Sequence, residues 1–297
     1  MAICIAAPTG NIGSRVVQLL IQAGVRPTII ARNPDRLDSA VRETSDVRQG
    51  NLMDTDFVLQ ATRDADALFW LIPTNYVSHD PLGEMIQMGE VAAKAIHENG
   101  IKRTVFLSSA GAERRGKKDP IGTLGQVEDI LNATGGNILC LRPGYFYTNL
   151  LMDVEPLQQG VLPTMIPLDV PMPWNDPRDI GDIVAARLLH TDWTGQTVQK
   201  INGPRHLTYA EVASIISEVT GHAVQAIRVT GEETRSALLV TGMSPAAADA
   251  MVQMSVGLED IASDEYAPTF VSTTPSPLEG WCYANLRPVL RSPESAK

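Results

Sequence analysis

The sequence predicts an α/β protein with a doubly wound parallel sheet, followed by a smaller C-terminal α/β cap. Two observations lead to this prediction. Short apolar runs alternate with helical patterns from Met1 to about Gly144, which is typical of a parallel sheet covered on both faces. After Gly144 the chain becomes rich in proline, which interrupts regular structure. A chain of 297 residues has room for about two domains.

Six strands are expected before the change in composition. They are Ile3–Ala6, Thr28–Ala31, Asp46–Gly50, Ala67–Leu71, Thr104–Ser108 and Ile138–Leu141. The helices between them are expected at Ser14–Ala23, Pro34–Glu43, Thr55–Ala61, Gly83–Asn99 and Gly122–Ala133. Because crossovers between parallel strands are right-handed, the simplest strand order is 3-2-1-4-5-6, and ligands bind at the carboxyl ends of such strands.

The second part of the chain carries helix signals of its own. Asp179 is expected to cap a helix over Ile180–Leu189. Thr208 and Glu211 have the spacing of a capping box, and the helix that they begin should end at Gly221. Further helices are expected at Glu232–Val240 and Pro245–Leu258. We therefore predict a dinucleotide-binding Rossmann domain over residues 1–144, a substrate-binding cap over 145–291 that could return chain to the sheet, and a frayed tail over 292–297.

Composition narrows the class of protein. The formal net charge of −10 argues against nucleic acid as a partner, because binding to phosphate backbones relies on clustered Lys and Arg. Three scattered cysteines, with no His, Cys or carboxylate cluster at ligand spacing, predict neither a metal site nor a disulfide framework. No basic leader and no run of eighteen apolar residues is present, so we expect a cytoplasmic protein with no membrane partner. The sequence leaves open whether it is a monomer or a homodimer.

A glycine turn follows the first strand directly. The sequence after Ile3–Ala6 reads Ala-Pro-Thr-Gly-Asn-Ile-Gly over residues 7–13, and a helical pattern comes next. A dinucleotide site needs a backbone that can approach a pyrophosphate closely and a helix N-terminus that favours anionic charge. We therefore expect Thr9, Gly10, Asn11 and Ile12 to bind the phosphates of a nicotinamide cofactor.

The end of the second strand indicates which cofactor is preferred. An NAD-binding chain usually carries an acid here, on the ribose 2′-hydroxyl. This sequence has Arg32 instead, a planar cation suited to a 2′-phosphate. The missing acid and the present cation together predict NADP(H), although Arg32 could also be an ordinary surface residue.

Two further strand ends should line the cofactor. Asn51 and Leu52 follow the third strand and are expected near the adenine, and Ile72 and Pro73 follow the fourth strand and are expected near the ribose and pyrophosphate. The alternative is that all four are ordinary loop residues.

Several motifs in order resemble one family. They are Gly10–Gly13, Ala31–Pro34, Phe106–Ala110, Leu141–Phe146, Gly203–Pro204 with Leu207–Val212, and Leu278–Trp281. Together they are similar to the NmrA-like group of atypical short-chain dehydrogenases/reductases, over nearly the whole chain. The resemblance implies an extended Rossmann domain, a preference for NADP(H), and one of two roles. Some members reduce quinones, dyes or other conjugated molecules, and others are redox sensors or regulators that bind the cofactor.

The usual proton relay of the wider superfamily is missing. That relay uses a Tyr with a Lys one helical turn later, but no tyrosine occurs between Ser109 and Gly136. The lysine that many relatives carry four residues before the helix glutamate is replaced by Leu124, because that glutamate is Glu128. An acceptor that is already electrophilic, such as a quinone, can be reduced without this relay. We therefore predict an NADPH-dependent reductase of a small conjugated substrate, with a non-catalytic redox sensor as the alternative.

Candidate groups near the nicotinamide are few. Ser108 and Ser109 end the fifth strand and could bind the nicotinamide ribose or a substrate carbonyl, or simply tie the strand to its loop. Tyr145 ends the sixth strand region and is the nearest substitute proton donor and a cofactor contact, or else a packing aromatic. Apolar cap residues could form a slot for a flat ligand, with core packing as the alternative: Met165, Met172, Trp174 and Phe270.

Overall fold

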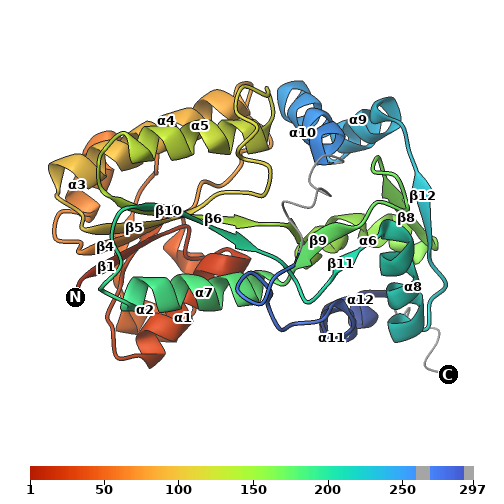
Figure 1. Cartoon of the computed structure of the whole chain (residues 1–297), viewed down its shortest axis with the longest axis horizontal. Helices are drawn as coiled ribbons and strands as arrows, with labels where there is room; N and C mark the ends of the chain where they lie inside the picture. The colour runs from red at the N-terminus through yellow and green to blue at the C-terminus, as the bar shows by residue number, and fades with distance from the viewer. Residues whose placement is uncertain (259–267, 291–297) are drawn as a thin grey trace. The chain divides into compact units, whose positions relative to one another are not determined.

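The computed structural model describes residues 1–258 and 268–290 (Figure 1). The chain forms two compact units. The first comprises Met1–Arg142 and Ile180–Gln199, and the second comprises Pro143–Asp179 and the described residues from Lys200 onward.

A seven-stranded sheet forms the centre of the first unit. Its strands are β1 (Ile3–Ala6), β2 (Thr28–Ala31), β3 (Asp46–Gln49), β4 (Ala67–Trp70), β5 (Arg103–Leu107), β6 (Asn137–Pro143) and β10 (Gln196–Ile201). The order across the sheet is β10-β6-β5-β4-β1-β2-β3, and the five pairings from β3 to β6 are parallel. The predicted order 3-2-1-4-5-6 is confirmed, and β10 extends the sheet beside β6.

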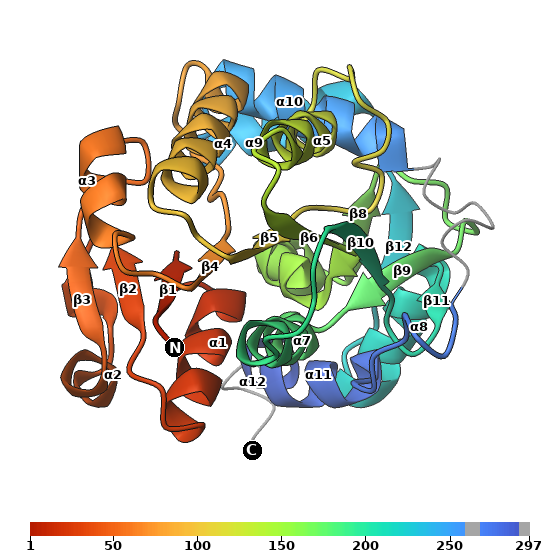
Figure 2. The same cartoon turned by 60° about the vertical axis from the view of Figure 1, so that its left-hand side comes forward.

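Helices cover both faces of this sheet. They are α1 (Asn11–Gln22), the 3-10 turn η1 (Pro34–Arg36), α2 (Ser39–Thr44), α3 (Thr55–Ala61), α4 (Pro81–Glu98), α5 (Pro120–Asn132) and α7 (Pro177–Leu189). Figures 1 and 2 show α3, α4 and α5 on one face and α1, α2 and α7 on the other. The core beneath α4 and α5 includes Trp70, Met85, Phe106 and Val127, all at most 2% exposed. Burial of these apolar side chains fixes the sheet, and with it the strand ends.

Two predicted elements differ from the structure. The helix expected over Pro34–Glu43 is broken, because Leu37 adopts an extended conformation and is only 7% exposed. Asp179 is not an N-cap, since α7 already begins at Pro177 and proline suits the first helical turn. Its carboxylate instead accepts hydrogen bonds from the Ser276 backbone N–H (3.0 Å) and hydroxyl (2.7 Å).

The second unit contains two small sheets and several short helices. Strands β7 (Tyr145–Phe146), β9 (Met172–Asn175) and β11 (His206–Leu207) form one sheet, and β8 (Val161–Thr164) pairs with β12 (Gln225–Arg228) in the other. The helices are η2 (Tyr147–Asp153), α6 (Val154–Gln158), α8 (Tyr209–Thr220), α9 (Gly231–Val240), α10 (Pro245–Leu258), α11 (Leu278–Asn285) and α12 (Arg287–Leu290). The capping box of Thr208 and Glu211 is confirmed, as is the left-handed Gly221 at the other end of α8. The tail over 292–297 lies outside the described residues.

Candidate functional site

The turn between β1 and α1 is tight and open to solvent. Ala7 adopts a left-handed backbone (φ 53°), which is uncommon for a residue with a side chain. Thr9, Gly10 and Asn11 are exposed, whereas Ile12 is 5% exposed. Gly10 is the N-cap of α1, and no side chain caps the helix there. The first turn of α1 therefore presents its positive dipole end and backbone N–H groups without a side-chain partner at the cap.

The two glycines of this turn have different surroundings. A Cβ atom on Gly13 would lie 2.2 Å from the carbonyl oxygen of Ala7, so only glycine lets the helix pack this closely on the turn. A Cβ atom on Gly10 would meet nothing closer than that same oxygen at 3.9 Å. Packing within the protein therefore requires glycine at position 13 and leaves space beside position 10.

Arg32 lies directly after β2. It is exposed, and its side chain makes no hydrogen bond or ion pair with any residue that the structure describes. Its backbone carbonyl accepts a hydrogen bond from the Gln49 side chain (3.4 Å), which ties the ends of β2 and β3 together. Arg36, on the turn η1 that follows, is a second exposed cation that the sequence interpretation did not select. The end of β2 thus carries two exposed arginines and the exposed Asp35 between them, with Arg32 at the position where an NAD-binding chain has an acid.

The residues after β3 and β4 divide into exposed and buried positions. The Asn51 side-chain oxygen accepts from the Met53 backbone N–H (3.1 Å), which forms a local turn. Leu52 (5% exposed) and Ile72 (8% exposed) both belong to the hydrophobic core. Pro73 is half-buried. Leu52 and Ile72 therefore have a packing role in the protein itself.

Ser108 and Ser109 follow β5. Ser108 is 4% exposed, its backbone N–H donates to the Leu141 carbonyl (2.9 Å), and its buried hydroxyl has no hydrogen-bond partner among the described residues. The Ser109 hydroxyl donates to the Ala110 carbonyl (3.0 Å). A buried hydroxyl without a partner is costly, so the Ser108 hydroxyl suits a bound polar group better than an apolar core.

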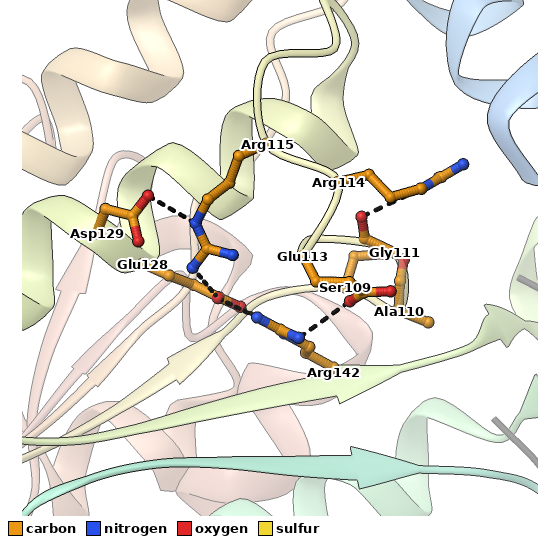
Figure 3. Close-up of polar contacts among 9 residues, drawn as sticks. All are labelled: Ser109, Ala110, Gly111, Glu113, Arg114, Arg115, Glu128, Asp129 and Arg142. Atoms are coloured by element: carbon orange, nitrogen blue, oxygen red, sulfur yellow. Dashed lines mark hydrogen bonds and ion pairs between the residues drawn. The ribbon is translucent and has the colours of Figure 1, made fainter. Parts of the chain in front are cut away.

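A buried ion network supports the loop that follows these serines (Figure 3). Glu128 on α5 is 1% exposed and receives two hydrogen bonds from Arg142 on β6 (2.9 and 2.5 Å) and one from Arg115 (3.2 Å). Arg142 also binds the Glu113 carboxylate in the loop (2.9 Å), and Arg115 binds Asp129 (2.6 Å). A paired guanidinium and carboxylate have a fixed geometry, so the network fixes the path of the loop relative to α5 and β6.

The first unit brings one group of predicted residues to a single edge. Parallel neighbours β3, β2, β1, β4 and β5 end on the same side of the sheet. The residues that follow those ends are Asn51 and Leu52, Arg32, Thr9–Ile12, Ile72 and Pro73, and Ser108 and Ser109. The predicted site residues other than Tyr145 therefore share the carboxyl edge of the sheet.

Tyr145 belongs to the second unit and lies in an aromatic cluster. In the parallel pairing of β7 with β9 it stands opposite Trp174, and their ring centroids are 4.7 Å apart. Tyr209, at the start of α8, packs against both rings, 5.2 Å from Trp174 and 6.4 Å from Tyr145. The sequence analysis did not select Tyr209 as a site residue, although it lies within the motif Leu207–Val212 and directly after the N-cap Thr208.

For the four apolar residues of the second unit, the sequence left open a ligand slot or core packing, and the structure shows core packing for two of them. Met172 (2% exposed) and Trp174 (0%) are core residues, and the Trp174 indole donates to the Leu207 carbonyl (3.0 Å). Phe270 is fully exposed. Met172 and Trp174 therefore fill the core of the second unit, and Met165 is half-buried.

Within the described ranges, no group of three His, Cys, Asp or Glu side chains is arranged to hold a metal ion. In the same ranges, no helix combines the length and apolarity needed to cross a bilayer. Cys4, Cys140 and Cys282 are buried, and burial raises the pKa of each thiol to about 12. These cysteines behave as small core residues and not as nucleophiles.

Known proteins resemble this chain over most of its length. A model of the NmrA-like family matches residues 1–278. The NAD(P)H azoreductase of Xenophilus azovorans is 24% identical over 273 residues, which is 92% of this chain and 91% of that one. The NADPH-dependent quinone oxidoreductase of Escherichia coli, solved with NADPH, superposes with a TM-score of 0.79 at 17% identity and covers 96% of this chain and 99% of its own. The triphenylmethane reductase of a Citrobacter species, solved with NADP(H), gives a TM-score of 0.75 at 18% identity, with 96% and 99% covered.

Proposed function

Because the chain belongs to the NmrA-like family, we propose that it is an NADP(H)-dependent reductase that delivers hydride to a small conjugated or quinone-like acceptor. The relatives named for azo, quinone and triphenylmethane acceptors support this proposal. The observation that carries it is the turn from Ala7 to Gly13, where Gly13 is required by packing and Gly10 has open space beside it. Such a turn at a helix N-terminus fits a pyrophosphate.

The proposed cofactor site follows the edge of the sheet. Thr9, Gly10, Asn11 and Ile12 bind the pyrophosphate through backbone N–H groups, and Arg32 binds the 2′-phosphate. Asn51 and Leu52 lie near the adenine, Ile72 and Pro73 near the ribose and pyrophosphate, and Ser108 and Tyr145 near the nicotinamide. The Ser108 hydroxyl, which has no hydrogen-bond partner in the described part of the chain, and the exposed Arg32 guanidinium are the polar groups that best fit this assignment.

The chain itself contributes few reacting groups to the proposed reaction. The cofactor, when bound, supplies the hydride. The protein positions the acceptor, excludes water and provides a proton, with Tyr145 as the donor and Ser109 as a hydrogen-bond partner of the acceptor. We propose residues 145–291 as the cap that binds the acceptor, apart from Ile180–Gln199, which belong to the first unit. The cytoplasmic location and the choice between monomer and homodimer stay predictions.

A direct test measures NADPH oxidation at 340 nm by stopped flow with quinones, azo dyes and triphenylmethane dyes as acceptors. We expect oxidation above background with at least one acceptor, and slower oxidation with simple ketones, because the superfamily's Tyr-Lys relay is missing. If no acceptor in the panel accelerates NADPH oxidation, the reductase proposal is wrong.

A redox sensor is the second candidate, favoured by the absence of tyrosine from residues 110–136 and by Leu124 in place of the lysine. A sensor should bind NADPH and NADP⁺ with different affinities, and calorimetric titration of both forms measures this difference. Equal dissociation constants would eliminate the sensor, because a ligand pair with equal affinities cannot shift a conformational equilibrium.

A further inference from the structure

The loop between β4 and α4 buries polar residues and exposes apolar ones. In its segment Asn75–Ser78, which we call the loop turn, Asn75 is half-buried and Ser78 is 8% exposed. The two apolar residues between them lie outside, with Tyr76 39% and Val77 68% exposed. A single exposed apolar side chain is common on protein surfaces. An aromatic side chain and a valine exposed together, between inward polar neighbours, indicate a contact surface.

The geometry of the loop turn does not account for these two residues. The Ser78 backbone N–H donates to the Asn75 carbonyl (3.2 Å), so Tyr76 and Val77 are the two central residues of a β-turn. Gly, Pro, Asn, Asp and Ser are the residues that turns usually contain. The chain places an aromatic and a β-branched residue there instead, and neither makes the turn easier to form.

Glu84, in the first turn of α4, fixes both ends of the loop turn. Its carboxylate accepts hydrogen bonds from the Ser78 hydroxyl (2.6 Å) and from the Asn75 side-chain amide (3.1 Å). Hydrogen bonds to a carboxylate are stronger than those between neutral groups. The two apolar side chains are therefore presented by an ordered frame, and an ordered surface loses little conformational entropy when a ligand binds.

The loop turn belongs to the carboxyl edge of the sheet in the first unit. Strand β4 pairs with β1, whose end carries the glycine turn, and with β5, whose end carries Ser108. Three residues separate Pro73 from Tyr76, so the Cα atoms of these two residues are at most about 11 Å apart. Tyr76 therefore lies beside the middle strands of the proposed cofactor edge.

We infer that Tyr76 contacts the acceptor: its ring, with Val77 beside it, stacks on a flat conjugated molecule, and Glu84 is the positioning residue that holds the loop turn. This inference rests on the proposed function and deepens it, because it assigns an acceptor contact and favours acceptors with more than one fused ring. Partial burial raises the pKa of the Tyr76 phenol, so the side chain stays neutral. Stacking of neutral aromatic rings contributes to binding beyond the apolar area that it buries.

The test measures binding of menadione, a two-ring quinone, to the full chain saturated with NADP⁺, which has no hydride to transfer. Calorimetric titration compares the wild-type protein with Tyr76→Ala and Tyr76→Phe. We expect Tyr76→Ala to weaken menadione binding about fivefold, because the stacking contact is lost. Tyr76→Phe should keep the wild-type affinity, because the ring and not the hydroxyl makes the contact.

Glu84→Ala tests the positioning role. It releases both ends of the loop turn and should weaken menadione binding by up to about fivefold, and Tyr76→Ala should then cause less further loss than in the wild-type background. In steady-state reduction of menadione, KM for the quinone should rise while kcat stays the same, a split that general loss of structure would not produce. Glu90→Ala, which removes an exposed acid of the same helix, is the matched control and should change neither value.

Tyr283→Ala controls for the loss of an exposed tyrosine. Tyr283 is 61% exposed, but the Arg287 guanidinium already covers its ring at 4.6 Å, so menadione affinity should stay at the wild-type value. The inference is overturned if the wild-type complex does not bind menadione or if Tyr76→Ala binds it as tightly as wild type does. Equal weakening in Tyr76→Ala and Tyr283→Ala overturns it as well. A change of molar mass by light scattering in Tyr76→Ala, with menadione binding unchanged, would assign the loop turn to contact between copies of the chain.

The inference and the proposed function fail in different ways. If the wild-type protein reduces menadione and Tyr76→Ala leaves its KM unchanged, the reductase proposal stands and the inference is wrong. If Tyr76→Ala weakens menadione binding but the wild-type protein reduces no acceptor of the panel, the reductase proposal is wrong and the loop turn remains a binding site for a flat aromatic ligand.

Discussion

Gly10 and Gly13 occupy the same turn for different physical reasons. A side chain at Gly13 would collide with the Ala7 carbonyl, whereas the space beside Gly10 is open. A sequence motif treats the two glycines alike, but the structure separates a packing requirement from a space left for a ligand. A substitution at position 13 therefore tests folding, and a substitution at position 10 tests cofactor binding.

We expect Gly13→Val to lower the free energy of unfolding by about 3 kcal/mol, because overpacking displaces the turn. Gly10→Val should cost only about 1 kcal/mol, since valine is a poor N-cap, yet it should abolish cofactor binding. Urea unfolding without cofactor and calorimetric titration with NADPH measure the two effects. Unweakened NADPH binding by Gly10→Val would contradict the assignment of this turn.

Asp153, at the end of η2, makes stability depend on pH. Burial raises the pKa of its carboxyl from 3.8 to about 6. The folded state binds this proton more tightly than the unfolded state. The stability that this proton contributes is therefore complete below pH 3.8 and is lost as pH rises through about 6. We expect Asp153→Asn to be more stable than wild type by about 2 kcal/mol at pH 8. The difference should be much smaller near pH 4, and an equal difference at both pH values would contradict the shift.

Four elements, β1, β2, α3 and α10, have the bounds that the sequence predicted. The helix over Pro34–Glu43 was wrong because Leu37 turns into the core, a tertiary effect that local pattern does not reveal. Strand β10 was not located, because Gln196–Ile201 is polar and mostly exposed, as an edge strand can be. The Glu128–Arg142 pair was also missed, since its partners are 14 residues apart on different elements.

At the scale of α5, the ion network predicts a large difference between neighbouring acids. Glu128→Gln leaves Arg142 without its buried carboxylate and should lower the free energy of unfolding by about 3 kcal/mol. Asp129→Asn, the matched control, removes a carboxylate whose side chain is 55% exposed and should cost less than about 1 kcal/mol. Thermal unfolding of both variants tests the claim. Equal losses of stability would show that the buried Glu128–Arg142 pair stabilises the protein no more than the exposed ion pair of Asp129 does.

For the whole molecule, sequence order and crossover handedness were enough to predict the order of six of the seven strands, and the sheet places most predicted site residues on one edge. The family assignment from scattered motifs is confirmed by the match over residues 1–278. The aromatic cluster of Tyr145, Trp174 and Tyr209 could not be predicted, because it depends on how three distant segments of the second unit fold together. The fold and the cofactor edge follow from local signals, whereas the surroundings of Tyr145 depend on tertiary packing.

The central claim is that the carboxyl edge of the sheet binds NADP(H), with Arg32 reading the 2′-phosphate. Calorimetric titration of the wild-type protein with NADPH and NADH tests it most directly. We predict NADPH to bind at least about tenfold more tightly, with the preference lost or reversed in Arg32→Asp and kept in Arg63→Asp, an exposed arginine before β4 at the opposite edge. The account would be contradicted if neither NADPH nor NADH gave a heat of binding, or if the preference for NADPH survived Arg32→Asp.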